Sequence, residues 1–256
     1  MIKELFNLKG KTALVTGGGQ GIGRAITLAL AEYGADVVIN YRSHSKLAEQ
    51  TAADAEKFGV KAHLWQFDLV RADVGKAWGE FSEANGVPAD ILVANASMQV
   101  RAPYDQLTDE DFEAQINVNL RSTLRLIKEV VPHMSKNHWG RILNIGSVQQ
   151  ARPHKDMCVY AASKAGLVNL VKNLAPRLAP MGITINNLAP GAIATARNVD
   201  ALADADYKKA VESNIPLGYV GTAEDCAATA LLLCSDAGRY ITGADFFVDG
   251  GLSLRF

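Results

Sequence analysis

The sequence has few cysteines and no excess of either charge, and both features narrow the classes of protein to which it can belong. Its three cysteines, Cys158, Cys226 and Cys234, are an odd number without a Cys-x-x-Cys pair. They predict neither a disulfide framework nor a zinc ribbon, so we expect reduced thiols and a cytoplasmic location. The 26 basic and 27 acidic residues leave a net charge of -1, which argues against a nucleic-acid partner and against a membrane-surface role based on bulk charge.

Long hydrophobic runs are also missing. No stretch approaches the ~20 apolar residues needed to span a bilayer, and residues 1–7 lack the apolar core of a secretory signal. His133 and His138 are five positions apart and do not share a helical face, so they do not predict a metal site. We therefore expect no membrane partner and no bound metal.

What the sequence does contain is a regular alternation of short β-branched runs with longer amphipathic stretches. This pattern indicates βαβ units, hence a doubly wound α/β fold of one domain (residues 1–256), with a parallel sheet covered by helices on both faces. Residues 192–219 break the rhythm; they follow a strand and predict a substrate-loop insertion. The expected strands are Thr12–Thr16, Asp36–Tyr41, 61–67, Ile91–Ala94, 141–145, 184–188 and 246–248, and the clearest helices are 23–33, 46–58 and 111–134.

A glycine-rich loop joins the first expected strand to the first helix. Gly17, Gly21 and Gly23 let the backbone turn sharply and approach a pyrophosphate, and the following helix offers N–H groups and a partial positive charge. The spacing differs from G-x-G-x-x-G, and no Walker lysine follows, so a tight turn without a ligand is the alternative. Its place after the first strand favours a bound dinucleotide.

The end of the second expected strand indicates which dinucleotide. A carboxylate there would bind the adenosine ribose hydroxyls, but the chain has Tyr41, Arg42 and Ser43. Arg42 can pair with a 2′-phosphate and Ser43 can donate to it, whereas a solvated arginine is the alternative. We expect NADP(H) as the preferred cofactor, with NAD(H) left open.

Tyr160 and Lys164 stand one helical turn apart, and Ser147 lies thirteen residues upstream. A phenol with a pKa of about 10 is a poor base on its own, and an ammonium group on the same helical face favours its phenolate. A serine hydroxyl at the same place would hold a carbonyl oxygen. The three residues therefore indicate acid–base chemistry on a carbonyl or an alcohol, although by themselves Tyr160 and Lys164 could equally be an ordinary exposed helix pair.

These residues resemble the short-chain dehydrogenase/reductase family from about Leu8 to the C-terminus. The family fold is a Rossmann fold with a seven-stranded parallel sheet in the order 3-2-1-4-5-6-7. The order and spacing of the motifs carry the resemblance: residues 16–23, Asp68, Asn95 with Ala96, Asn119, Ser147, Tyr160-x-x-x-Lys164, Pro190 with Gly191, and 248–251.

The resemblance implies a role for each matching residue. Tyr160 is the expected acid or base, Lys164 activates it and binds the nicotinamide ribose, Ser147 holds the reacting oxygen, and Asn119 binds a water that relays protons to Lys164. Asp68 would meet the adenine, and Thr195 would lie near the carboxamide. Asn95 would join and support the central strands and lie beside the adenosine ribose. The full set of expected cofactor residues is Gly17, Gly19, Gln20, Gly21, Ile22, Gly23, Tyr41, Arg42, Ser43, Asp68, Leu69, Asn95, Ala96, Tyr160, Lys164, Pro190, Gly191, Ile193 and Thr195.

Two positions depart from the family pattern. Ser97 replaces the glycine that usually follows Asn95 and Ala96, and its Cβ could crowd the cofactor or redirect the substrate loop. Gly146 precedes Ser147 where a second serine is common, which leaves one candidate for the catalytic serine.

The implied activity is reversible reduction of a carbonyl to a secondary alcohol with NAD(P)H. Ser97, Gln149, His154 and Arg197 are the expected substrate residues, although His154 could equally be a solvated loop residue. The many hydrogen-bond donors in the expected pocket favour a sugar, a polyol or an oxo acid as substrate over a bulky steroid. The main alternative activity is that of a 3-oxoacyl thioester reductase. The alternative of another class is a non-catalytic dinucleotide-sensing regulator. The remaining donors in the expected pocket are Gln99, Arg101, Gln150, Arg152, Lys155 and Asn198.

The resemblance also implies a homotetramer. The expected contacts are the 111–134 helix, the 160–179 helix and the 246–256 segment. The apolar side chains of Leu120, Leu124 and Ile127 could equally be core residues.

Overall fold

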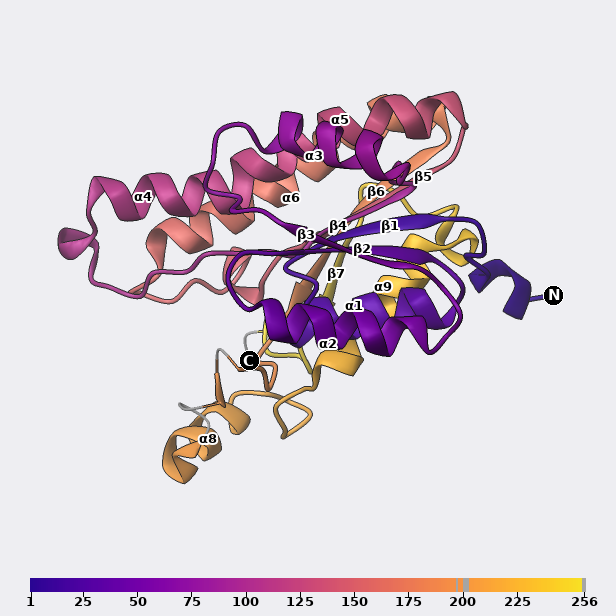
Figure 1. Ribbon diagram of the computed structural model, residues 1–256. Coiled ribbons are helices and arrows are strands. Elements are labelled where there is room, and N and C mark those ends of the chain that lie inside the picture. The colour runs from indigo at the N-terminus through magenta and orange to yellow at the C-terminus, as the bar shows by residue number, and fades with distance from the viewer. Residues whose placement is uncertain (197, 200–202, 255–256) are drawn as a thin grey trace.

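Seven parallel strands form one sheet in the order β3-β2-β1-β4-β5-β6-β7. The computed structural model describes residues 1–196, 198–199 and 203–254. The doubly wound α/β fold and the strand order predicted from the sequence are both confirmed (Figure 1). The strands are β1 (Thr12–Thr16), β2 (Asp36–Tyr41), β3 (Ala62–Gln66), β4 (Ile91–Ala94), β5 (Gly140–Ile145), β6 (Ile183–Pro190) and β7 (Asp245–Val248).

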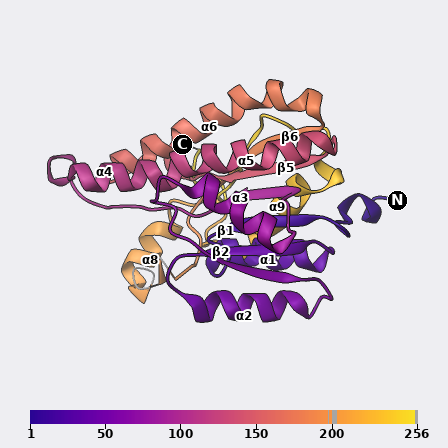
Figure 2. The same cartoon turned by 45° about the horizontal axis from the view of Figure 1, so that its top comes forward.

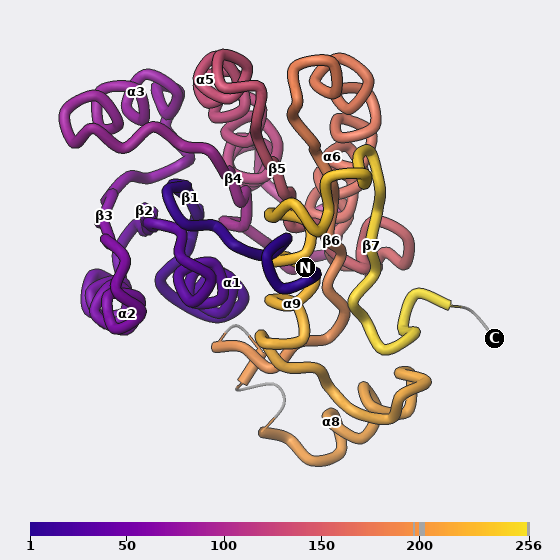
Figure 3. Tube along the Cα trace, turned by 90° about the vertical axis from the view of Figure 1, so that its right-hand side faces the viewer, coloured from indigo at the N-terminus to yellow at the C-terminus, as the bar shows by residue number. Residues whose placement is uncertain are grey.

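Helices cover both faces of the sheet. One layer contains α1, α2 and α9, and the other contains α3, α4, α5 and α6, while α8 stands away from both layers (Figures 1 and 3). Figure 2, a tilted view, shows the same separation of α5 and α6 from α1 and α2. The bounds are α1 (Gly21–Glu32), α2 (Ser45–Glu56), α3 (Val74–Asn85), α4 (Asp109–Ile116), α5 (Ser122–Lys136), α6 (Cys158–Leu178), α8 (Ala205–Glu212) and α9 (Ala223–Cys234).

The hydrophobic core lies in two layers because strand side chains alternate between the faces of the sheet. In β1, Leu14 packs into the cluster on the α3, α5 and α6 side, and Val15 packs into the cluster on the α1 and α9 side. All four residues of β4 and all eight residues of β6 are buried, as expected for strands covered on both faces. The two layers leave the carboxyl ends of the strands open for a ligand.

Two predicted elements differ from the observed ones. The expected helix 111–134 is two α-helices joined by a π-helical turn at Asn117–Arg121, and the first of them begins at a capping box between Thr108 and Asp111. The expected loop 192–219 contains the helix α8, which Asp204 caps through the amides of Asp206 and Tyr207. Across the described part of the chain, no helix is both long enough and apolar enough to cross a membrane.

Candidate active site

A cavity of about 750 Å³ lies at the carboxyl ends of the strands. It opens where the strand order reverses between β1 and β4, which is the expected ligand position in a doubly wound sheet. Its volume lies within the range of ordinary ligand pockets. Every expected cofactor residue lines it, together with Ser97, Ser147, Gln149 and His154.

The glycine loop forms the floor of this cavity beneath the start of α1. Gly21 has a φ of +52°, which a residue with a side chain rarely adopts, and a Cβ on Gly23 would lie 2.2 Å from the carbonyl oxygen of Gly17. Gln20 makes no side-chain cap to α1, so the first amide groups of that helix point toward the cavity. This is the arrangement that binds phosphate in a nucleotide.

Asn95 fastens the glycine loop to the end of β4. Its Nδ2 donates to the carbonyl oxygens of Thr16 at 2.9 Å and Gly17 at 3.1 Å, and its backbone N–H donates to the Thr16 hydroxyl at 2.9 Å. The Ala96 N–H donates to the same hydroxyl at 3.0 Å. These bonds support the expectation that Asn95 joins the central strands.

The end of β2 forms the far wall of the cavity. Arg42 and Ser43 are exposed at its edge, and Tyr41, Asp68 and Leu69 lie beside them. The carbonyl of Arg42 accepts a hydrogen bond from Gln66, but within the described chain no side chain pairs with its guanidinium group. A cation is therefore available where a 2′-phosphate would be expected.

Asn40 is a residue in this wall that the sequence reasoning did not assign to the site. Its Oδ1 accepts from the Gly17 amide at 3.4 Å, and its Nδ2 donates to the carbonyl oxygens of Trp65 and Phe67, both at 3.2 Å. Only 2% of the residue is exposed, so a polar side chain is buried at the end of an apolar strand. A polar residue at the end of an otherwise apolar strand was the sequence signal that could have identified Asn40 as a site residue.

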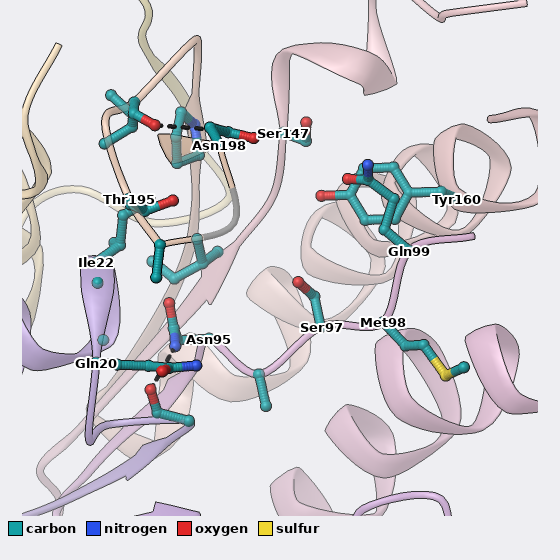
Figure 4. A pocket seen from close by; sticks show the side chains of 18 of the residues that line it. Gln20, Ile22, Asn95, Ser97, Met98, Gln99, Ser147, Tyr160, Thr195 and Asn198 are labelled. Atoms are coloured by element: carbon teal, nitrogen blue, oxygen red, sulfur yellow. Dashed lines mark hydrogen bonds between the residues drawn. The ribbon is translucent and has the colours of Figure 1, made fainter. Parts of the chain in front are cut away.

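Lys164, Tyr160 and Ser147 come together at the other end of the cavity. The Nζ of Lys164 donates to the carbonyl oxygen of Ile145 at 2.6 Å and lies 5.7 Å from the centre of the Tyr160 ring. Figure 4 shows Ser147 and Tyr160 facing the same pocket from different elements. Because Lys164 is only 2% exposed, its charge acts within the protein rather than in bulk water.

Asn119 is the one expected catalytic residue that does not line the cavity. It lies in the π-helical turn, where its Oδ1 accepts from the Met98 amide at 2.8 Å. Its Nδ2 donates to the carbonyl oxygen of Met98 and to the hydroxyl of Ser163, both at 2.9 Å. The side chain thus holds the segment that carries Ser97, and the relay through a water stays a prediction.

The nicotinamide side of the cavity is formed by the segment after β6. Pro190, Gly191, Ile193 and Thr195 all line it, and a Cβ on Gly21 would lie 3.4 Å from Cγ2 of Thr195. Asn198 donates to the carbonyl oxygen of Ile193 at 2.9 Å and keeps this segment in place. Figure 4 shows Thr195 beside Ile22, across the pocket from Tyr160.

On the substrate side of the cavity, some of the expected polar residues line the wall and others do not. Ser97, Gln99, Arg101, Gln149 and His154 line the cavity, whereas Arg197 lies outside the described residues. Tyr207 of α8 also lines the cavity, and no periodicity in the 192–219 segment pointed to it.

Three further expected donors do not line the cavity. Gln150 bonds to the Asp245 carboxylate, and Arg152 bonds to the carbonyl oxygen of Leu252 and to Asn214. Lys155 lines a second, shallower pocket beside α6. The expectation that these three side chains face the substrate is therefore not met.

His154 and Arg101 lie beside each other at the wall of the cavity. The Nδ1 of His154 accepts from the Asp156 amide at 3.1 Å, so in the neutral ring the proton lies on Nε2. That nitrogen is 3.3 Å from Nη2 of Arg101. Both side chains line the cavity, so this pair can donate to an oxygen atom of a polar ligand. Within the described residues, no cluster of three or more His, Cys, Asp or Glu side chains could hold a metal ion.

The comparisons with known proteins agree with this geometry. A family model described as enoyl-(acyl carrier protein) reductase matches residues 17–253. A 3beta-hydroxysteroid dehydrogenase 1 of Eggerthella lenta is 38% identical over 249 residues, which cover 97% of this chain and 95% of that protein.

Two solved structures are similar along the whole chain. A gluconate 5-dehydrogenase from Burkholderia cenocepacia, in complex with NADP and tartrate, is 35% identical, with a TM-score of 0.92 and full coverage of both chains. A 3-oxoacyl (acyl-carrier-protein) reductase from Agrobacterium tumefaciens with NADP bound is 36% identical, with a TM-score of 0.92, and the match covers 98% of this chain and 97% of that one.

Proposed function

The chain belongs to the short-chain dehydrogenase/reductase family and is a nicotinamide-dependent oxidoreductase of alcohols and carbonyls, and we propose that it uses NADP(H) on a polar small molecule. The observation that carries this proposal is the single cavity bounded by Arg42 at one end and by Ser147 and Tyr160 at the other. NADP bound to two similar structures supports the choice of cofactor.

The cavity fits a dinucleotide in shape and in chemistry. The α1 amides would hold the pyrophosphate, Arg42 and Ser43 would hold the 2′-phosphate, and the segment from Pro190 to Thr195 would hold the nicotinamide. When bound, the cofactor supplies or accepts the hydride. The protein's own residues then have to position the substrate and move one proton.

Tyr160 is the proposed proton donor when a carbonyl is reduced. Its hydroxyl would give a proton to the substrate oxygen while the Ser147 hydroxyl donates a hydrogen bond to the same atom. Lys164, fixed by Ile145, would stabilise the negative charge that remains on Tyr160. In alcohol oxidation the same proton moves in the opposite direction.

The substrate is proposed to be a sugar, a polyol or an oxo acid. The pair of donors formed by Arg101 and His154 supports a ligand with several oxygen atoms, and so does the tartrate in the gluconate 5-dehydrogenase structure. A 3-oxoacyl thioester is the second candidate because the similar Agrobacterium protein is named as a reductase of that class.

A substrate screen tests the proposal. The purified chain would be mixed with NADP or NADPH and with D-gluconate, acetoacetyl-CoA or a 3β-hydroxysteroid, and the nicotinamide absorbance would be followed. We expect turnover of gluconate or a related polyhydroxy acid. Turnover of acetoacetyl-CoA alone would select the thioester candidate, and steroid turnover would select the activity named for the Eggerthella relative. Tight NADPH binding without turnover of a broad carbonyl panel would favour a dinucleotide-sensing regulator.

We also propose that the chain forms a homotetramer in the cytoplasm. Exposed apolar side chains on two of the three expected contact segments support self-association: Phe112 on α4, and Phe247 and Leu254 near the C-terminus. Residues 255–256 of the expected C-terminal contact lie outside the described chain. Sedimentation at micromolar concentration would decide, and a monomer would refute this part of the proposal.

A further inference from the structure

A set of hydrogen-bonded amide side chains connects β7 to the turn that carries Ser147. The Asp245 carboxylate, at the start of β7, accepts from Nδ2 of Asn187 at 2.6 Å and from Nε2 of Gln150 at 2.9 and 2.8 Å. Asn187 lies on β6 and is fully buried, and it also accepts a hydrogen bond from Asn144 of β5. Figure 3 shows β5, β6 and β7 as neighbours, so the set crosses three adjacent strands.

Asp245 determines the direction of every hydrogen bond in this set. An ionised carboxylate can only accept, so Asn187 and Gln150 must both turn their NH₂ groups toward it. Their oxygen atoms then face away from β7. The Asn187 oxygen meets Asn144, and this orientation leaves Oδ1 of Asn144 without a partner among the described residues.

The same orientation places an acceptor beside Ser147. The Gln150 oxygen accepts from the Ser147 backbone N–H at 3.4 Å and from Asn187 at 3.2 Å. The Ser147 hydroxyl oxygen accepts from the Gln149 N–H at 3.2 Å. That bond uses a lone pair of the hydroxyl oxygen and leaves its proton available for donation to another acceptor, such as a substrate oxygen.

The side chains of this set occupy the space that a side chain at position 146 would need, and the chain has Gly146 there. A Cβ at that position would lie 2.5 Å from Oε1 of Gln150 and 2.6 Å from Nδ2 of Asn187. Neither atom can move away without breaking a bond of the set. The glycine found here, in place of the more common serine, is therefore the residue that the Gln150 and Asn187 side chains require.

We infer that Asp245, acting through Gln150 and Asn187, is a positioning residue that fixes the turn carrying Ser147. This inference rests on the proposed function, in which Ser147 holds the reacting oxygen. Asp245→Asn keeps one oxygen but places an NH₂ group where Oδ2 of Asp245 accepts from Nε2 of Gln150 at 2.8 Å, so two donors meet there. A rotation of Gln150 that relieves this contact would turn its NH₂ group toward the Ser147 N–H, which is also a donor.

The test compares Asp245→Asn with a matched exchange at Asp236. Asp236 accepts from Arg141 at 2.7 Å and from Trp139 at 2.9 Å, so Asp236→Asn also removes a charge from a hydrogen-bonded carboxylate, but outside the cavity. We expect Asp245→Asn to lower kcat about 10- to 100-fold, because small misplacement of a reacting group has effects of this size. NADPH affinity should stay within about twofold. Asp236→Asn should lower Tm and leave kcat unchanged.

A double variant distinguishes positioning from general destabilisation. If Asp245 acts through Ser147, adding Asp245→Asn to Ser147→Ala should lower kcat no further. Gln150→Leu removes the acceptor at similar volume, and it should reproduce the loss of kcat even if Asp245→Asn does not fold. The rates are measured with the gluconate and acetoacetyl-CoA probes named above.

The outcomes separate the two proposals. If Ser147→Ala has wild-type turnover, the proposed function fails and this inference fails with it. If Ser147→Ala is impaired but Asp245→Asn and Gln150→Leu change only Tm, the positioning role is overturned and the proposed function stands. A further additive loss in the double variant would also contradict the positioning role.

Discussion

Reversing the charge of Arg42 should change which dinucleotide the protein prefers. The guanidinium group lies at the edge of the cavity, at the end of β2, and no side chain of the described chain pairs with it. In Arg42→Asp, the cation that would face a 2′-phosphate is replaced by an anion that repels it. The same anion can accept hydrogen bonds from the ribose hydroxyls of NAD(H).

The size of the effect follows from the exposure of Arg42. A hydrogen bond to a charged group contributes about 1.5–3 kcal/mol, and an exposed ion pair contributes about 0–1 kcal/mol. Arg42 is exposed in the chain as it stands, but a bound nucleotide would cover part of it. We therefore expect the NADPH dissociation constant to rise about 10- to 100-fold, which corresponds to about 1.4–2.8 kcal/mol.

Fluorescence titration with NADPH and with NADH measures this change. Arg239→Asp is the matched control because it makes the same change in net charge at an exposed residue outside the cavity. NADH affinity should stay the same or increase in Arg42→Asp. In the protein with Arg42, the preference for NADPH over NADH should decrease at high salt, because salt screens exposed charges. An unchanged ratio of NADPH to NADH affinity would remove Arg42 from the account of cofactor choice.

Two other predictions test the glycine loop and the core. Gly23→Ala should lower the free energy of unfolding by about 1–3 kcal/mol through overpacking, with a lower Tm, and weaken NADPH binding at least about tenfold, because its Cβ would overlap Gly17 and Asn95. Gly79→Ala, whose Cβ would come no closer than 3.7 Å to Glu129, should leave both unchanged, and equal losses in the two variants would contradict the argument from close packing. Burial raises the pKa of the Cys226 and Cys234 thiols to about 12, so at pH 8 only about one in ten thousand of either is ionised. A thiol reagent should therefore titrate only the exposed Cys158 in the native protein and all three cysteines after denaturation; fast reaction of a second native thiol would refute this.

The sequence predicted the strands because their signal is local, whereas the strand order came from the family resemblance. Buried parallel strands such as β1 and β4 are continuous apolar runs, and their neighbours follow from the family pattern. The π-helical turn at Asn117–Arg121 was not predicted, because one extra residue in a turn shifts the apolar period too little to be seen among polar neighbours. The helix α8 was missed because it is short and none of its residues is buried, so its periodic signal is weak.

The site was predictable where a motif fixes the backbone and not where contacts join distant parts of the chain. The spacing of the glycine loop, Ser147, Tyr160 and Lys164 singles these residues out, and the family resemblance supplies their expected roles. The bonds of Asn119 to Met98 depend on packing between residues 21 positions apart. Gln150 and Asp245 are 95 positions apart, and only the order of β5, β6 and β7 brings them together.

The central claim is that the Tyr160 hydroxyl transfers the proton, and Tyr160→Phe tests it most directly. This change removes one oxygen atom and keeps the ring packed beside Lys164. Steady-state rates are measured with the substrate that the protein turns over fastest, and NADPH affinity is measured in parallel. We expect kcat to fall by about 10²–10⁴-fold while cofactor binding stays unchanged. The control Tyr240→Phe, at a fully exposed residue, should behave as wild type. A Tyr160→Phe protein that turns over its substrate at the wild-type rate would contradict the account.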